Sequence, residues 1–243
     1  MSDIFINTLV FNDVSTRHDQ KEYILSLYES GYKNIEIRRE YLNNLEDELE
    51  DIGEVVREKD ITLYFSIPDT LFDSNKINQE KITNYFQEAE ILGSKTVKLV
   101  VGDYNEISTE DEAFLKKIVS KEILLFIEND QTQENGKVDK ILKFLKEAKE
   151  KNINVRLTFD IGNWFWTQED PKKNAEILNE FIDYVHFKDV TKVNGLNEAQ
   201  LLNTGYVDIK YFIDYFSGKS FGIEYPCGKE VIPVIKEEIN KLS

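Results

Sequence analysis

Residues 155–163 read Val-Arg-Leu-Thr-Phe-Asp-Ile-Gly-Asn, a mostly apolar run that closes on the carboxylate of Asp160. Three other apolar runs carry an acidic or imidazole side chain near their ends. They are Ile-Leu-Leu-Phe-Ile-Glu-Asn at 123–129 with Glu128, Tyr-Val-His-Phe-Lys-Asp at 184–189 with His186, and Phe-Gly-Ile-Glu-Tyr-Pro at 221–226 with Glu224. This repeated pattern predicts four buried strands that each end in a polar side chain.

The spacing of these four side chains indicates a parallel sheet. The intervals from residue 128 to 160, 160 to 186 and 186 to 224 are 32, 26 and 38 residues, each long enough for one helix and its two loops. Side chains at the carboxyl ends of neighbouring parallel strands converge in space. Two glutamates, one aspartate and one histidine suit a single divalent metal ion, for which we consider Mn, Mg, Co or Zn.

The length and the remaining apolar runs favour a closed barrel. The chain has 243 residues, close to the ~250 typical of a (β/α)8 TIM barrel, and 41% are hydrophobic. We therefore expect one domain over residues 1–243. A doubly wound open sheet is the alternative, but the glycine-rich phosphate loop that such sheets often carry is missing. Eight strands are expected at 3–10, 34–38, 61–67, 96–102, 123–129, 155–161, 184–190 and 220–226.

Helical periodicity fills the intervals between these strands. The clearest helices are expected at 20–30, 43–59, 78–92, 137–151 and 228–241. Side chains suited to N-caps and C-caps support the boundaries. They are Asp19, Asn78, Ser108 and Asp208 at N-caps, Gly31 and Gly93 at C-termini, and Pro171 in a first turn. The segment 191–207 has no clear periodicity, so we expect an irregular lid over the site.

Charge and cysteine content narrow the class of partner. The net charge of −16 and the pI near 4.7 argue against nucleic acid and against an anionic membrane. The single cysteine, Cys227, excludes an intrachain disulfide and fits a reducing compartment. No secretion signal and no apolar run of ~18 residues is evident. We expect a cytoplasmic protein.

Four short segments resemble the xylose isomerase-like barrels, specifically the sugar phosphate isomerase/epimerase group. They are Ile-Glu-Asn at 127–129, Phe-Asp-Ile-Gly-Asn at 159–163, Val-His-Phe-Lys-Asp at 185–189 and Gly-Ile-Glu at 222–224. The resemblance covers essentially the whole chain. It implies that Glu128, Asp160, His186 and Glu224 bind one divalent metal, and that Glu128 and Glu224 form the acid/base pair.

Two departures from the family pattern concern the substrate. Many members have a histidine at the end of the third strand, where this chain has Ser66. Many epimerases have a histidine three residues after the sixth-strand aspartate, where this chain has Asn163. The related endonuclease IV function is disfavoured, because its trinuclear zinc site needs many histidines and this chain has only His18 and His186.

Four further polar side chains are candidate substrate ligands, each with a structural alternative. Glu36 and Arg38, in the Ile-Glu-Ile-Arg segment that the family uses for substrate contact, could hold a polyol or pair with each other. Lys188 could bind a substrate oxyanion or phosphate, or pair with a neighbouring carboxylate. Asn163 could donate to a substrate hydroxyl or hold the turn after Gly162.

These expectations combine into one leading function and two alternatives. The leading one is a metal-dependent isomerase or epimerase of a ketose or sugar phosphate, which acts through an enediolate. A keto-sugar dehydratase of the inosose type would start from the same enediolate. A barrel that binds a polyol or metabolite without turnover is the non-enzymatic alternative. The expected partner is a small sugar or sugar phosphate, bound by a monomer or a homo-oligomer.

Overall fold

The computed structural model describes residues 3–14, 19–119 and 122–242, and it forms a closed parallel barrel. Within these residues eight strands pair in the ring order β1-β2-β3-β5-β6-β7-β8-β11, and β11 returns to β1. The predicted (β/α)8 fold is confirmed. The ring strands are β1 (Ile4–Asn7), β2 (Asn34–Arg38), β3 (Thr62–Asp73), β5 (Thr96–Gly102), β6 (Leu124–Glu128), β7 (Val155–Asp160), β8 (Ile182–Phe187) and β11 (Ser220–Ile223).

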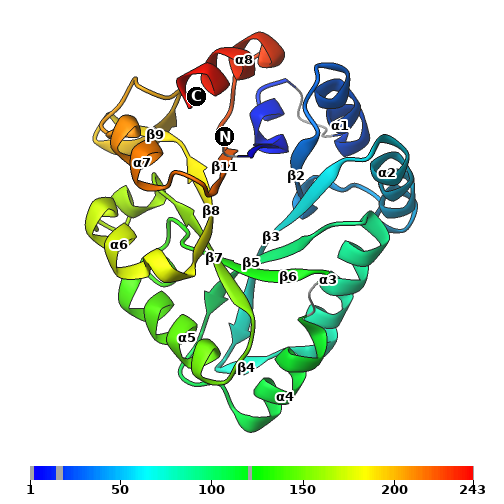
Figure 1. Cartoon of the computed structure of the whole chain (residues 1–243), viewed down its shortest axis with the longest axis vertical. Coiled ribbons are helices and arrows are strands. Elements are labelled where there is room, and N and C mark those ends of the chain that lie inside the picture. Colours follow the sequence, from blue (N-terminus) through cyan, green and yellow to red (C-terminus); the bar gives the residue numbers. More distant parts are fainter. Residues whose placement is uncertain (1–2, 15–18, 120–121, 243) are drawn as a thin grey trace.

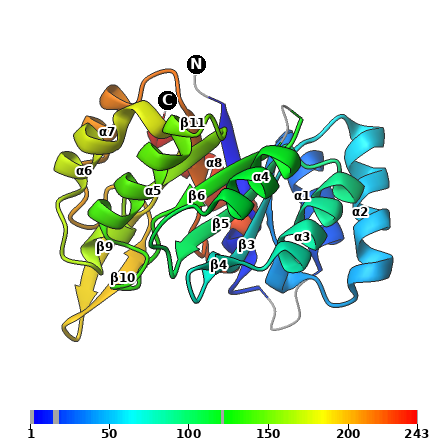
Figure 2. The same ribbon diagram turned by 90° about the horizontal axis from the view of Figure 1, so that it is seen from below.

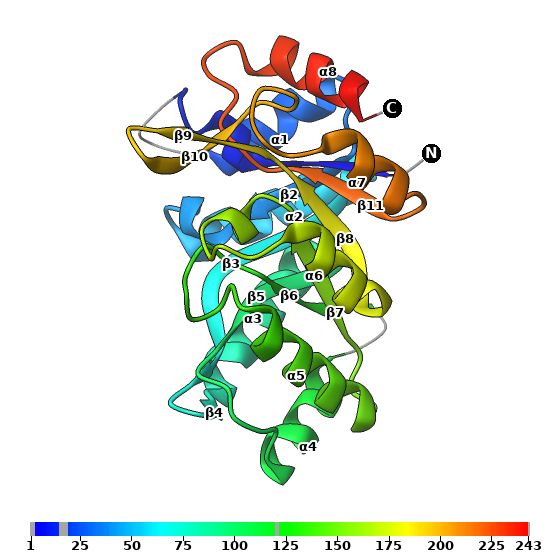
Figure 3. The same cartoon turned by 90° about the vertical axis from the view of Figure 1, so that its left-hand side faces the viewer.

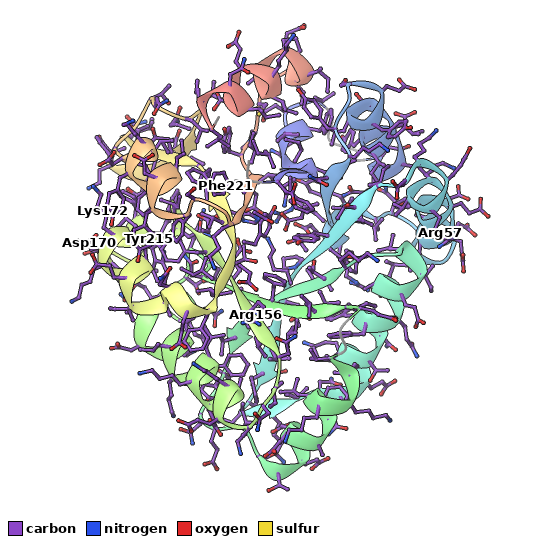
Figure 4. All side chains as sticks on the ribbon, viewed as in Figure 1. Arg57, Arg156, Asp170, Lys172, Tyr215 and Phe221 are labelled. Carbon is purple, nitrogen blue, oxygen red and sulfur yellow. The ribbon has the colours of Figure 1, made fainter. Side chains whose placement is uncertain are left out.

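Helices surround the barrel on the outside (Figure 1). In the described residues they are α1 (Gln20–Glu29), α2 (Leu45–Lys59), α3 (Gln79–Leu92), α4 (Thr109–Ile118), α5 (Val138–Glu150), α6 (Pro171–Leu178), α7 (Ile209–Tyr215) and α8 (Val231–Lys241). Many of their charged side chains face outward, as Arg57 and Lys172 do at the rim of Figure 4. None of the helices described is both long and apolar enough to cross a membrane.

The predicted caps explain where several helices begin and end. Asp19, Asn78, Ser108 and Asp208 each accept a hydrogen bond from a backbone N–H in the first turn of their helix. Gly93 ends α3 with φ of 71°, a conformation that glycine adopts without strain. These boundaries are therefore fixed by local chemistry.

Several strand ends differ from the sequence prediction, and the last strand stops at Ile223 instead of residue 226. The first strand stops at Asn7, because the Asn7 side chain accepts from Leu9 N and caps a 3-10 helix, η1 (Thr8–Phe11). The third strand continues past residue 67 to Asp73, with a register shift between Ser66 and Thr70 where Pro68 interrupts the ladder. Its outer part pairs with the short strand β4 (Lys76–Ile77).

The expectation that residues 191–207 are irregular is wrong for their first half. The predicted seventh strand breaks after Phe187, and an antiparallel hairpin follows, formed by β9 (Asp189–Val193) and β10 (Leu196–Gln200). Asn194 and Gly195 have φ of 52° and 85°, as a two-residue hairpin turn requires. The hairpin projects from the barrel at the end away from the start of β1 and the end of α8 (Figures 2 and 3).

The barrel interior is layered. Phe5, Phe126 and Tyr184 form a small buried cluster with Tyr64 packed against it, separate from the main core between the strands and the helices. Each of these side chains lies two positions before an inward-facing polar residue on its own strand. The aromatic cluster therefore forms an apolar floor beneath a polar upper layer.

Candidate metal centre and cleft

The structure brings together the four side chains that the sequence proposed as metal ligands. Glu128 and Asp160 are the last residues of β6 and β7, His186 lies in β8, and Glu224 follows β11 directly. One ligand atom from each lies within 4.8 Å of the other three. These four side chains are hereafter called the ligand cluster. Because β6, β7, β8 and β11 are consecutive in the ring, the cluster occupies one sector of the barrel mouth.

The distances within the ligand cluster match a coordination shell. His186 Nδ1 lies 2.9 Å from Glu128 Oε1, 3.1 Å from Glu224 Oε2 and 3.7 Å from Asp160 Oδ2. Ligand atoms about 2.1 Å from a metal ion, at octahedral or tetrahedral angles, are roughly 3.0–3.4 Å apart. Three carboxylate oxygens and one imidazole nitrogen also suit a divalent ion of intermediate hardness. The residues present therefore fit a single divalent metal.

Glu36 lies below the ligand cluster and makes three close polar contacts. Its Oε2 atom accepts from Tyr184 Oη at 2.8 Å and lies 2.8 Å from His186 Nε2. Its Oε1 atom lies 2.7 Å from Lys98 Nζ. Glu36 is 1% exposed and does not line the cleft described below. The alternative that Glu36 pairs with Arg38 is also not seen, since Arg38 contacts Glu40 and Glu224 instead.

Lys98 belongs to this polar layer, although the sequence analysis did not single it out. It lies in β5, is 3% exposed, and its Nζ atom is 2.7 Å from Glu36, 3.0 Å from Glu128 and 3.6 Å from Glu224. The signal in the sequence was a lysine in the middle of the apolar run Thr-Val-Lys-Leu-Val-Val-Gly. A lysine is almost never buried in this way unless it is paired.

Lys188 and Arg38 hold the cluster from the cleft side. Lys188 Nζ lies 2.7 Å from Asp160 Oδ2 and 3.6 Å from Glu224 Oε2. Arg38 Nη1 donates to Glu224 Oε1 at 2.9 Å. Gly162 leaves room for Lys188, since a Cβ at this position would lie 2.5 Å from Lys188 Cγ. Both cations line the cleft, where they can also meet a substrate.

Asn163 holds the turn that follows β7. Its Nδ2 atom donates to Asn129 O at 2.8 Å, and its backbone N–H donates to Asp160 Oδ1 at 2.9 Å. Asn129 in turn exchanges two hydrogen bonds of 2.9 Å with the backbone of Asp160. The Oδ1 atom of Asn163 is buried and finds no hydrogen-bond partner among the described residues. Asn163 thus fixes Asp160, and the residue also lines the cleft.

A cleft of about 480 Å³ opens above the ligand cluster. Glu128 and Glu224 line it, whereas Asp160 and His186 lie beneath and are fully buried. None of its described lining residues comes from 191–207, so the segment proposed as a lid does not form a wall of the cleft here. The walls come instead from the end of β2, the middle of β3 and the loops after β6 and β7, including Arg38, Ser66, Asp69, Asp130, Gln131, Thr132, Asn135 and Asn163.

Burial and mutual charge set the ionisation of the cluster. Burial opposes ionisation of Glu224, but the positive charges of His186 and Lys98 outweigh it and hold its pKa well below the usual value. Burial likewise opposes the charged form of His186, but the surrounding carboxylates raise its pKa well above the usual value. The cluster is therefore an ion network, and a metal at Nδ1 would replace a proton.

Gly222 makes space for the centre of the network. It pairs with His186 across β11 and β8. A Cβ atom at this position would collide with the hydroxyl of Tyr184 and lie 2.7 Å from His186 Cδ2. Since Tyr184 and His186 both bond to Glu36, the absence of a side chain at 222 keeps all three in place.

Solved structures with the same fold include a dehydratase and two sugar epimerases. The probable 3-DHS dehydratase AsbF of Bacillus anthracis has a TM-score of 0.69 at 17% identity, covering 100% of this chain and 98% of that one. L-ribulose 3-epimerase has a TM-score of 0.68 at 14% identity, with 99% and 86% coverage. D-allulose 3-epimerase from Methylomonas sp., solved with D-allulose, has a TM-score of 0.69 at 13% identity, with 98% and 95% coverage.

At these identities the structural likeness shows the fold alone. Among curated proteins, no sequence matches this chain. The family model of the xylose isomerase-like TIM barrel matches residues 25–242, which is most of the chain. This chain therefore belongs to the xylose isomerase-like TIM barrel family.

Proposed function

We propose that the protein is a divalent-metal-dependent isomerase or epimerase of a ketose or sugar phosphate. The observation that carries the proposal is the different depth of the four cluster residues. Glu128 and Glu224 reach both the shared metal position and the cleft, while Asp160 and His186 reach only the former. Two carboxylates that reach both the metal position and the substrate can serve as the base that takes a proton and the acid that returns one.

The ligand roles follow from this arrangement. Glu128, Asp160, Glu224 and His186 Nδ1 would hold the ion, and His186 Nε2 would donate to Glu36. A metal-bound histidine commonly donates its other ring N–H to a carboxylate in this way. When bound, the ion would act as a Lewis acid toward the carbonyl and neighbouring hydroxyl of the sugar and stabilise the negative charge that develops. We infer that Glu36 orients His186 and does not contact the substrate.

The two glutamates would move the protons. Glu128 and Glu224 come from β6 and β11, which bracket β7 and β8 in the barrel, so they approach the cleft from two sides. One carboxylate takes the proton from the carbon beside the carbonyl, and the C–H electron pair forms the C=C bond of an enediolate. The other returns a proton to the opposite face in epimerisation, or to the adjacent carbon in isomerisation.

Three polar side chains of the cleft wall would position the sugar. Lys188 and Arg38 can donate to substrate oxygens that carry negative charge, since both line the cleft. Asn163 lines the cleft beside them and would contact the sugar there. The keto-sugar dehydratase alternative uses the same first step, and one solved structure of similar fold is named a probable 3-DHS dehydratase.

Solvent deuterium exchange tests the proposal. The metal-free protein is loaded with Mn²⁺ in deuterated water and incubated with a panel of ketoses and their phosphates, and the metal is removed before NMR. We expect deuterium at the carbon beside the carbonyl of at least one sugar. Loss of water from the sugar would instead establish the dehydratase. If neither deuterium uptake nor loss of water occurs with any sugar of the panel while Mn²⁺ is bound, the barrel that binds a polyol without turnover would be favoured.

A further inference from the structure

The buried cation Lys98 differs from Arg38 and Lys188, the two other lysine or arginine side chains of the polar network. Arg38 and Lys188 line the cleft, where water or substrate can reach them. Lys98 does not line the cleft and is 3% exposed. Its charge is therefore compensated by Glu36, Glu128 and Glu224 rather than by solvent.

Lys98 contacts the oxygens that face away from His186 Nδ1. It lies 3.0 Å from Glu128 Oε2, whereas Glu128 Oε1 is the oxygen 2.9 Å from Nδ1. It lies 3.6 Å from Glu224 Oε1, whereas Glu224 Oε2 is the oxygen 3.1 Å from Nδ1. Lys98 thus orients the two glutamates without occupying the oxygens that face the metal position.

We propose that Lys98 is a permanent internal counter-ion, which lets the barrel fold without metal and limits how tightly the site binds a divalent ion. The four carboxylates of Glu36, Glu128, Asp160 and Glu224 repel one another in the barrel interior, where little water can reach them. Removal of Lys98 therefore leaves buried negative charge uncompensated. The same ammonium would repel a divalent ion held by those carboxylates, because the two cations would share the same ligands at short range. The inference rests on the proposed metal site but not on any reaction.

Lys98 affects metal binding in two opposite ways: it orients the glutamate ligands, which favours binding, and it repels the ion, which opposes binding. The larger of the two effects decides how Lys98→Met changes the affinity. Loss of orientation would weaken binding, but Arg38 and Asn7 still donate to Glu224 Oε1 at 2.9 and 3.1 Å. Loss of repulsion between a single and a double charge at short range would strengthen binding far more. Removal of a lysine with a merely structural role would only loosen the site and so weaken Mn²⁺ binding.

The test is the Mn²⁺ affinity and melting temperature of Lys98→Met, measured on the full-length protein after chelation. We expect a lower melting temperature without metal, a larger rise on saturation with Mn²⁺, and a dissociation constant at least about tenfold lower than in the wild type. Lys172→Met is the matched control, because Lys172 pairs with Asp208 at the exposed rim (Figure 4). It should leave the Mn²⁺ affinity unchanged.

A double variant guards against misfolding of Lys98→Met. Glu36→Gln with Lys98→Met removes one charge of each sign, so it should melt closer to the wild type than Lys98→Met does. Lys98→Met that folds only when Mn²⁺ is added supports the proposal. An affinity that is unchanged or weaker, no Mn²⁺ binding by either protein, or failure to fold at saturating Mn²⁺ overturns it. The Mn²⁺ affinity and the melting temperature do not depend on catalytic activity. The test of Lys98 therefore stands even if no deuterium exchange is observed.

Discussion

His186 Nε2 lies 2.8 Å from Glu36 Oε2, on the ring edge opposite to the Nδ1 atom that faces the three carboxylates of the ligand cluster. This pairing places a hydrogen-bond donor toward Glu36 and leaves Nδ1 as the nitrogen able to bind a metal ion. It also fixes the plane of the ring. The carboxylate-histidine pair is thus the element on which the proposed metal centre depends.

Glu36→Gln should weaken Mn²⁺ binding by roughly 10–100-fold, as loss of an outer-shell carboxylate commonly does. The amide can still accept from Tyr184 and His186, so the barrel should remain folded. Titration calorimetry with Mn²⁺ measures the affinity. Glu88→Gln is the control, because Glu88 forms an ion pair with Arg39 outside the cluster. Equal affinities in Glu36→Gln and the wild type would show that Glu36 does not support His186.

The acid stability of the metal-free protein should depend on Glu36. Burial opposes ionisation of Glu36, but the charges of Lys98 and His186 outweigh it and lower its pKa from 4.5 to about 2. The unfolded chain therefore binds more protons between these values, and the stability that Glu36 contributes is complete above pH 4.5 and is lost as the pH falls toward 2. As the pH falls through this range, the melting temperature should drop more steeply for the wild type than for Glu36→Gln. Parallel curves would contradict this.

Gly222→Ala should destabilise the barrel by about 1–3 kcal/mol, because the added methyl group collides with Tyr184 and His186 in a packed interior. It should also weaken Mn²⁺ binding by displacing the His186 ring. Chemical denaturation measures the free energy of unfolding. In a Tyr184→Phe background the hydroxyl is gone, so the penalty should shrink. A penalty of the same size in both backgrounds would show that the clash is elsewhere.

The strands could be predicted from the sequence more accurately than the side-chain contacts of the polar layer. The apolar runs at 34–38 and 96–102 match β2 and β5, because buried parallel strands must be apolar on both faces. Lys98 was overlooked since a single charge in such a run leaves the strand pattern intact. The depth of Glu36 depends on how strands stagger around the barrel, which local patterns do not encode. The Asn194-Gly195 pair is the local signal for the hairpin, because both residues adopt the positive φ that its two-residue turn requires.

Glu224→Gln should keep the fold and lose catalysis. The amide has the same size but cannot take a proton at neutral pH, so the general-base contribution of ~10²–10⁴ in rate should disappear. The substitution also removes an anionic ligand, so metal occupancy must be measured on the same sample at saturating Mn²⁺. Lost deuterium uptake with retained metal and unchanged melting supports the two-glutamate mechanism. Uptake near the wild-type level at full occupancy would exclude Glu224 as the base.

The location of a bound metal tests the central claim most directly. Crystals of the protein soaked in Mn²⁺ can be measured at a wavelength where manganese scatters anomalously. One strong peak is expected about 2.0–2.3 Å from Glu128, Asp160, Glu224 and His186 Nδ1, at the mouth of the barrel. No peak there, or a peak that contacts other residues while these four keep their ion pairs with Lys98 and Lys188, would contradict it.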